Sequence, residues 1–162
     1  MLLAVQEILH NYVAQAAFWG WFSAQLIKFL TMMIRHRTLR FERLVGSGGF
    51  PSAHTSFIRA TTTAIYIKEG ADSDVFILAL VTAFIVMYDA TGVRRESGKQ
   101  AEALNQIISY FSKRGIPVTL RSHEKALKEL LGHTPVEVMG GVILGICIAC
   151  VQYYFVYHCV IQ

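Results

Sequence analysis

Charged residues are scarce in this 162-residue chain, at 16% of all positions, whereas 54% of the residues are hydrophobic and the mean hydropathy is +0.43. An ordinary soluble domain has about 25% charged residues. We therefore expect a single membrane-embedded domain over residues 1–162. The net charge of +4 would suit nucleic acid, but so apolar a chain indicates basic loops at a membrane surface, with membrane lipids and no nucleic acid as partners.

Cysteines are few, and their spacing is not that of a secreted disulfide framework. All three, Cys147, Cys150 and Cys159, lie in the last apolar segment. Two of them have C-x-x-C spacing, but no other metal-ligand cluster accompanies them, so we interpret them as small apolar residues and expect no metal and no cofactor. The N-terminus lacks the pattern of a removable signal peptide, and we expect none.

Four apolar segments predict an all-α, polytopic membrane helix bundle. A spanning helix needs about 20 mostly apolar residues. The first segment, 12–30, lies in a helix-like stretch that covers residues 2–34. The second, 51–68, is less apolar, and its Arg59 and Thr61–Thr63 suggest that other helices enclose it. The third and fourth segments are residues 75–88 and about 132–157.

Residues 96–114 have a different pattern. Apolar residues recur there at helical spacing among polar ones. This pattern predicts an amphipathic helix at the membrane interface or on the other helices, followed by a short helix over about residues 122–131. The apolar positions are Ala101, Leu104, Ile107, Ile108 and Phe111.

Basic residues gather in the loops after the first and third spans, whereas the turn between the second and third spans is acidic. Basic loops stay in the cytoplasm, so both loops are expected there and both termini on the opposite side. The basic residues are Arg35, Arg37, Arg40, Arg43, Arg94, Arg95, Lys99, Lys113, Arg114, Arg121, Lys125 and Lys128.

The stretch GSGGFPSAHT, residues 46–55, has the composition of a phosphate-binding loop. Its glycines let backbone N–H groups converge, and Pro51 suits a helix start whose N–H groups would point at an anion. Ser52 adds a hydroxyl, and His54 adds a group that titrates near neutral pH. The alternative is an ordinary glycine-rich turn in which His54 is a structural hydrogen-bonding residue.

A second histidine, His133, begins the last span on the same side as His54. Glu137 lies four residues later and shares its helix face, so its carboxylate could orient the imidazole. Alternatively, Thr134 and Glu137 form a helix-capping box. Within the first span, Lys28 would either face a functional cavity or extend to the headgroups.

Three short patterns occur in order along the chain. Lys28 is followed seven positions later by Arg35, and residues 51–54 read Pro-Ser-Ala-His. His133 is followed four positions later by Glu137.

The stretches YDATGVRR (88–95), GKQA (98–101) and GHTPVEV (132–138) accompany them, together with Leu104-Asn105. Over nearly the whole chain, these patterns resemble the divergent branch of the type 2 phosphatidic acid phosphatase superfamily, whose relatives include the vanadium haloperoxidases. The superfamily patterns have Pro, Gly, Ser-Arg and Asp where this chain has His36, Ala53, Ala126-Leu127 and Glu137.

The resemblance implies a metal-independent lipid phosphate phosphatase that acts through a phosphohistidine. His133 would attack phosphorus, Glu137 would orient it, and His54 would protonate the leaving oxygen. The phosphate oxygens would be held by Lys28, Arg35, Ser52 and the backbone at Ala53, with Arg94 or Arg95 in place of the missing third-motif arginine. Its candidate lipid substrates are phosphatidylglycerophosphate, which we favour, phosphatidate and polyprenyl diphosphate.

Two other classes of function stay open. One is a non-catalytic membrane protein that retains the scaffold for lipid binding or assembly. The other, a small transporter, is disfavoured because the polar residues gather at one membrane face. Four spans make a small bundle, so a homodimer is a reasonable expectation.

Overall fold

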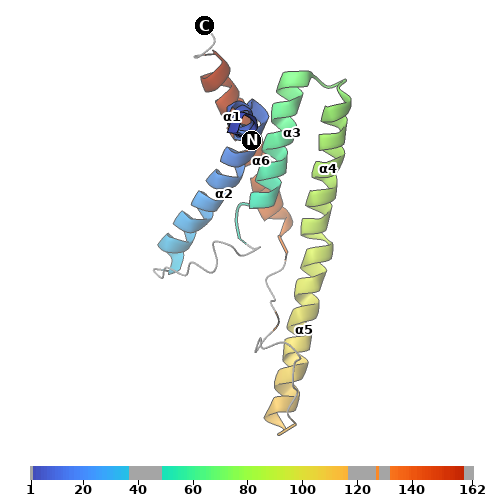
Figure 1. The fold of residues 1–162 in the computed structure, drawn as a ribbon. Helices are drawn as coiled ribbons and strands as arrows, with labels where there is room; N and C mark the ends of the chain where they lie inside the picture. Colours follow the sequence, from blue (N-terminus) through green and yellow to red (C-terminus); the bar gives the residue numbers. More distant parts are fainter. Residues whose placement is uncertain (1, 37–48, 117–126, 128–131, 159–162) are drawn as a thin grey trace.

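The computed structural model of the chain describes residues 2–36, 49–116, 127 and 132–158 (Figure 1). These residues form helices and no strand, which confirms the all-α prediction. The basic residues between 37 and 48, and most of the short helix expected over 122–131, lie outside this part of the chain. The elements are α1 (Leu2–His10), α2 (Tyr12–His36), α3 (Ala53–Glu69), α4 (Asp74–Thr91), α5 (Val93–Lys113), α6 (Pro135–Gln152) and the π-helical turn η2 (Tyr153–His158).

The N-terminal stretch differs from the single helix expected over residues 2–34, because it divides at Asn11 into α1 and α2. The Asn11 side chain explains the break. Its Oδ1 accepts hydrogen bonds from the N–H groups of Val13 and Ala14, at 2.9 and 3.2 Å. Asparagine is one of the strongest N-cap residues, so it begins a new helix at this position.

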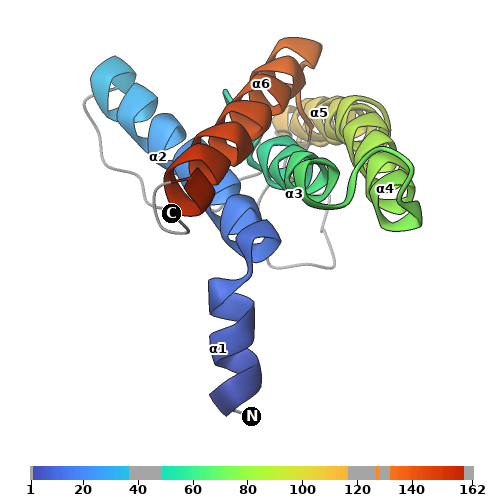
Figure 2. The same cartoon turned by 90° about the horizontal axis from the view of Figure 1, so that it is seen from above.

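Helix α3 lies at the centre of the bundle and packs against α2, α4 and α6 (Figure 2). This confirms that other helices enclose the second apolar segment. Close approach between α3 and α6 depends on glycine. A Cβ atom at Gly141 would lie 2.6 Å from the Ser52 carbonyl oxygen, and one at Gly145 would lie 2.6 Å from that of Ser56. Small residues of this kind let helix backbones meet in membrane proteins.

Two helical segments are long and apolar enough to cross a membrane, namely Asp74–Lys113 and Pro135–Phe155. They contain the third predicted span, residues 75–88, and most of the fourth, which was expected over about residues 132–157. Among the described helices, α2 and α3 do not meet the same criterion, although both pack against α6. The count of four spans therefore stays a prediction.

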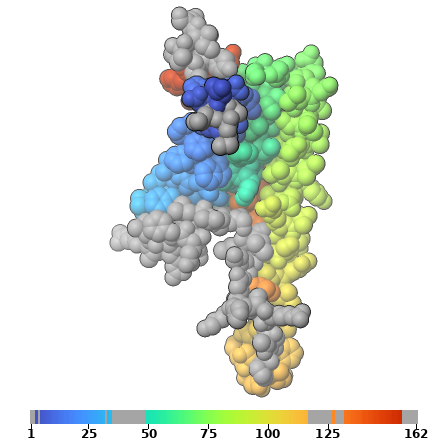
Figure 3. Space-filling model, in the orientation of Figure 1, coloured from blue at the N-terminus to red at the C-terminus, as the bar shows by residue number. Residues whose placement is uncertain are grey.

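The amphipathic helix is present as α5, with Gly98 and Ala101 on its buried side. It continues the direction of α4 and extends past the other helices (Figures 1 and 3). Its position relative to a membrane interface stays a prediction.

A polar contact joins α2 to α6 near the end of the bundle that is distant from α5. The Tyr12 hydroxyl donates to the Ala149 carbonyl oxygen at 2.7 Å, and Gln152 Nε2 donates to Gln15 Oε1 at 3.2 Å. These bonds satisfy polar groups between apolar helices and fix α2 against α6.

Candidate active site

Two backbone hydrogen bonds bring the ends of three helices together. The Ser52 N–H, just before α3, donates to the Glu137 carbonyl oxygen in α6 at 2.9 Å. The His133 N–H, just before α6, donates to the Ala90 carbonyl oxygen at the end of α4 at 3.0 Å. The chain segments that contain the predicted histidines are therefore held against one another by main-chain contacts.

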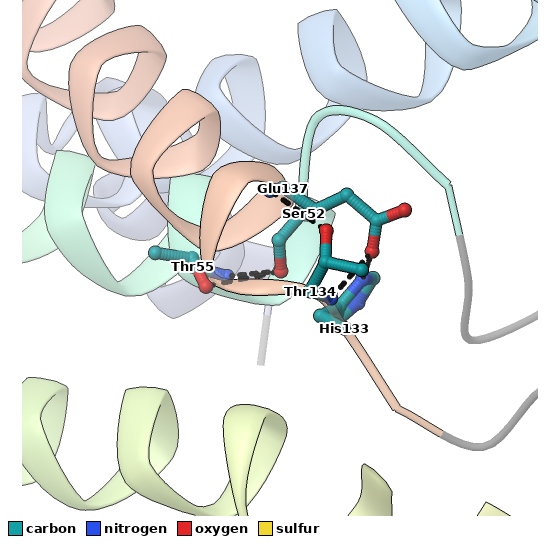
Figure 4. Close-up of polar contacts among 5 residues, drawn as sticks. All are labelled: Ser52, Thr55, His133, Thr134 and Glu137. Atoms are coloured by element: carbon teal, nitrogen blue, oxygen red, sulfur yellow. Dashed lines mark hydrogen bonds and ion pairs between the residues drawn. The ribbon is translucent and has the colours of Figure 1, made fainter.

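His133 and Glu137 form the central contact of this region (Figure 4). His133 Nδ1 lies 3.1 Å from Glu137 Oε2, and the histidine is only 3% exposed. Among the described residues, its Nε2 is buried and has no hydrogen-bond partner. A carboxylate at Nδ1 favours the tautomer in which Nδ1 carries the proton, which leaves the lone pair on Nε2.

Glu137 also caps α6. Its Oε2 accepts the Thr134 N–H at 3.0 Å, and its own N–H donates to Thr134 Oγ1 at 3.3 Å. The two alternatives from the sequence therefore coexist, because one carboxylate oxygen caps the helix and contacts the imidazole. The geometry by itself leaves the catalytic role of Glu137 a prediction.

Burial lowers the pKa of His133 below its usual value. The hydrogen bond and the negative charge of Glu137 oppose this shift, while the positive charges of Lys28 and Arg94 add to it. The net effect is a histidine that is neutral at physiological pH. A neutral imidazole with a free Nε2 lone pair has the protonation state that a nucleophile requires.

His54 lies in the first turn of α3, and its side chain is exposed. Partial desolvation and the positive charges of Arg94, His133 and Lys28 lower the pKa of His54, and the negative charge of Asp89 opposes this shift. The structure thus brings the two histidines into one electrostatic environment, as expected from their positions at helix starts. One histidine is exposed and the other buried, which suits two different chemical roles.

Ser52 is fully buried, and its side chain caps α3. Ser52 Oγ accepts hydrogen bonds from the Thr55 N–H at 3.4 Å and from the Thr55 hydroxyl at 3.0 Å (Figure 4). Its role as a phosphate ligand stays a prediction. Ala53 begins the helix, so its N–H and that of His54 are first-turn donors without an intrahelical acceptor.

Lys28 is only 6% exposed and lies on the packed face of α2, one helical turn after Ala24. This burial does not fit a side chain that extends to the headgroups. Gly49, which has a φ of 97°, lies close to the aliphatic part of Lys28, since a Cβ atom there would be 4.0 Å from Lys28 Cδ. Arg35 belongs to α2 two turns later, and its side chain lies outside what the structure describes, as do residues 46–48 of the glycine loop.

The two adjacent arginines have different surroundings. Arg94 Nε lies 2.5 Å from Asp89 Oδ2, and the Arg94 charge acts on both histidines. The Arg95 backbone instead lies close to Gly132, because a Cβ atom at Gly132 would lie 2.4 Å from Arg95 Cα. Of the two candidates for the missing cation, Arg94 is the one that the structure associates with the histidines.

Sequence reasoning gave no role to Asn105, which holds the chain six residues before His133. Its Nδ2 donates to the Leu127 carbonyl oxygen, and its Oδ1 accepts the Leu127 N–H, both at 2.9 Å. A side-chain amide paired with one residue's backbone has no spacing pattern that would reveal it. Across the described residues, no three His, Cys, Asp or Glu side chains come together as a metal site would require.

Fold and site together define an all-helical membrane protein with a histidine–carboxylate pair where helices α3, α4 and α6 meet. A family model described as the Divergent PAP2 family matches residues 9–148, and the chain belongs to that family. It is also similar to the "Uncharacterized membrane protein YuiD" of Bacillus subtilis (strain 168), with 35% identity over 155 residues that cover 92% of this chain and 98% of that protein. No solved structure gives a significant match.

Proposed function

We propose that the protein is an integral-membrane lipid phosphate phosphatase, which forms a phosphohistidine on His133. One observation carries this proposal. His133 Nδ1 contacts a carboxylate, while its Nε2 is buried, unprotonated and without a hydrogen-bond partner among the residues that the structure describes. A buried nitrogen without a hydrogen-bond partner is costly, and attack on phosphorus would give this lone pair a function.

In the proposed first step, His133 Nε2 forms a bond to phosphorus as the bond from phosphorus to the lipid oxygen breaks. The protonated form of His54 donates its proton to that oxygen, so the lipid leaves as an alcohol and His54 becomes neutral. In the second step, His54 takes a proton from water, the water oxygen attacks phosphorus, and the N–P bond breaks. Inorganic phosphate is released, and both histidines return to their initial state.

The cationic groups near the histidines support stabilisation of the transition state. Charge develops on the equatorial oxygens of phosphorus, and preorganised donors lower the barrier. Lys28 and Arg94 act electrostatically on His133, and the first-turn N–H groups of α3 lie beside His54. Lys28, Arg94 and these N–H groups are therefore our proposed phosphate ligands, with Arg35 and Ser52 as further candidates.

We further propose that the site faces the cytoplasm and that both termini lie on the opposite side. The support is the concentration of basic residues in the two loops next to the histidines. A phosphatidylglycerophosphate-like lipid is the favoured substrate within this proposal.

The test is phosphate release from a panel of lipid phosphates by purified full-length protein in mixed micelles. We expect release that persists in EDTA, is inhibited by vanadate and is abolished in His133→Ala. Release that disappears with chelator and returns with Mg²⁺ would contradict the proposed metal-independent mechanism.

A non-catalytic lipid-binding or assembly protein is the second candidate. It is favoured by the third motif, where Ala126 and Leu127 stand in place of Ser-Arg and Leu127 is held by Asn105. Lipid phosphate binding without phosphate release from any member of the panel would support it.

A further inference from the structure

A groove of about 390 Å³ lies between α3, α4 and α6, separate from the candidate active-site residues. Its walls are largely apolar. Figure 2 shows α3 between the other two helices, with the C-terminal part of α6 diverging from α4. Its lining includes Arg59, Thr63 and Tyr66 of α3, Phe76 of α4 and Ile146 of α6.

Arg59 is the charged residue of this groove. Its Nε is buried and has no hydrogen-bond partner within the described part of the chain. Its Cβ faces α6, since a Cβ atom at Gly145 would lie 2.9 Å from it. An arginine inside a membrane bundle is costly unless an acceptor meets it, so such a residue marks a functional contact.

The order of groups along α3 matches the order of groups in an ester-linked phospholipid. Arg59 follows His54 by five residues, which is about 7.5 Å along the helix. Tyr66 lies a further two turns away, beside Phe76, with ring centroids 5.3 Å apart. In such a lipid, the ester carbonyl oxygens lie between the phosphate and the hydrocarbon chains. The phosphate would lie at the histidines, a carbonyl oxygen at Arg59 and a chain in the apolar groove.

We propose that this groove binds one acyl chain of an ester-linked phospholipid and that Arg59 donates to the ester carbonyl oxygen. The position of the phosphate end rests on the proposed function. A polyprenyl phosphate has no acceptor oxygen beyond its phosphates and would leave Arg59 unpartnered. The groove therefore selects acyl lipids among the candidate substrates.

The test measures binding rather than turnover, with the full-length His133→Ala protein in detergent and native mass spectrometry of bound lipid. Dioleoyl phosphatidate is compared with the diether lipid that has the same chain length and headgroup. We expect the ester to bind roughly tenfold more tightly than the ether, which is the effect of one lost hydrogen bond to a charged donor. The added substitution Arg59→Met, which leaves no N–H donor at this position, should remove this difference.

A matched pair of substitutions tests the groove itself. Thr63→Phe, within the groove, should weaken binding of both lipids. Thr61 is on the same helix but lines a different hollow beside α1 and α2, so Thr61→Phe should bind both lipids as the parent protein does. If Arg59→Met fails to fold, as judged by thermal melting, the ester–ether comparison and the Thr63→Phe result still test the proposed binding of an acyl chain in the groove.

Equal binding of ester and ether by the protein that retains Arg59 would overturn the inference, as would unchanged binding in Thr63→Phe. Undecaprenyl phosphate that binds as tightly as phosphatidate would overturn it as well. A different outcome would separate the two proposals. If the ester binds in a manner that depends on Arg59, but the protein that retains His133 releases no phosphate from it, the proposed function is contradicted and the groove assignment stands.

Discussion

The substitution Glu137→Gln separates the two tasks of the shared carboxylate. Glutamine suits the last position of a capping box, because its amide oxygen still accepts the Thr134 N–H, so α6 should keep its cap. It removes the negative charge that lies 3.1 Å from His133 Nδ1. That charge matters during attack, because the imidazole becomes cationic when Nε2 bonds to phosphorus and Nδ1 keeps its proton.

The magnitude follows from the distance. Two unit charges 3.1 Å apart attract by about 5 kcal/mol at an effective dielectric constant of about 20. The carboxylate is 21% exposed and therefore partly screened. If screening leaves half of this attraction, the substitution Glu137→Gln removes about 2.7 kcal/mol of transition-state stabilisation. The value of kcat should then fall roughly a hundredfold. Phosphate release from a short-chain lipid phosphate, measured in detergent, gives this value.

Thr134→Ala is the matched control. It removes the hydroxyl that accepts the Glu137 N–H but leaves the carboxylate beside His133. We expect about 1 kcal/mol lower stability from the lost cap, seen as a lower Tm, with kcat within threefold of the original. The reasoning is refuted if Glu137→Gln also keeps kcat within threefold, because Glu137 would then serve only as a helix cap.

Three further predictions concern the two arginines, the pH dependence and the orientation in the membrane, and the first two use the same phosphate-release assay. Arg94→Lys should lower kcat/KM roughly tenfold and Arg95→Lys should not, because Lys cannot replace a bidentate ligand; equal effects would contradict the assignment. Burial lowers the pKa of His133, so the acid limb of the pH profile of kcat/KM should lie below pH 6.5, and a limb above pH 6.5 would contradict this. The free energy of unfolding should also decrease as the pH falls from 6.5 through the lowered pKa, because the unfolded chain then binds more protons at this group. In a cysteine-free background, Ser112→Cys should be labelled only from the cytoplasm and Ala71→Cys only from the opposite side, and the reverse pattern would move the site to the other leaflet.

Apolar run length and turn residues predicted most helices, because a membrane helix must satisfy its own backbone and needs a long apolar segment. The prediction of one continuous helix over residues 2–34 was wrong. The Asn11 side chain hydrogen-bonds to the backbone and competes locally with a continuous helix. Such a competition is decided by neighbouring packing, which a one-dimensional pattern does not contain.

The pairing of His133 with Glu137 was predicted from their spacing, but the predicted shared helix face was wrong, because His133 precedes α6 and meets the carboxylate that caps this helix. The choice between Arg94 and Arg95 could not be predicted from spacing, since adjacent residues differ only by about 100° around the helix axis. That choice depends on the direction of Asp89 and on the approach of Gly132 to the Arg95 backbone. The contact between Gly132 and Arg95 joins segments far apart in sequence, and the contact between Asp89 and Arg94 crosses the junction of α4 and α5.

The packing of the bundle and the placement of the candidate site come from one pattern. On each of α2, α3 and α6, small residues recur every four positions and form the ridge that lets these backbones approach. Each ridge ends in a polar residue of the candidate site, so a helix cannot shift along its neighbour without displacing that residue. Lys28, Ser52 and Glu137 are thus positioned by apolar contacts deep in the bundle. The ridges are Ala16, Gly20, Ala24 and Lys28; Ser52, Ser56, Ala60 and Ala64; and Glu137, Gly141, Gly145 and Ala149.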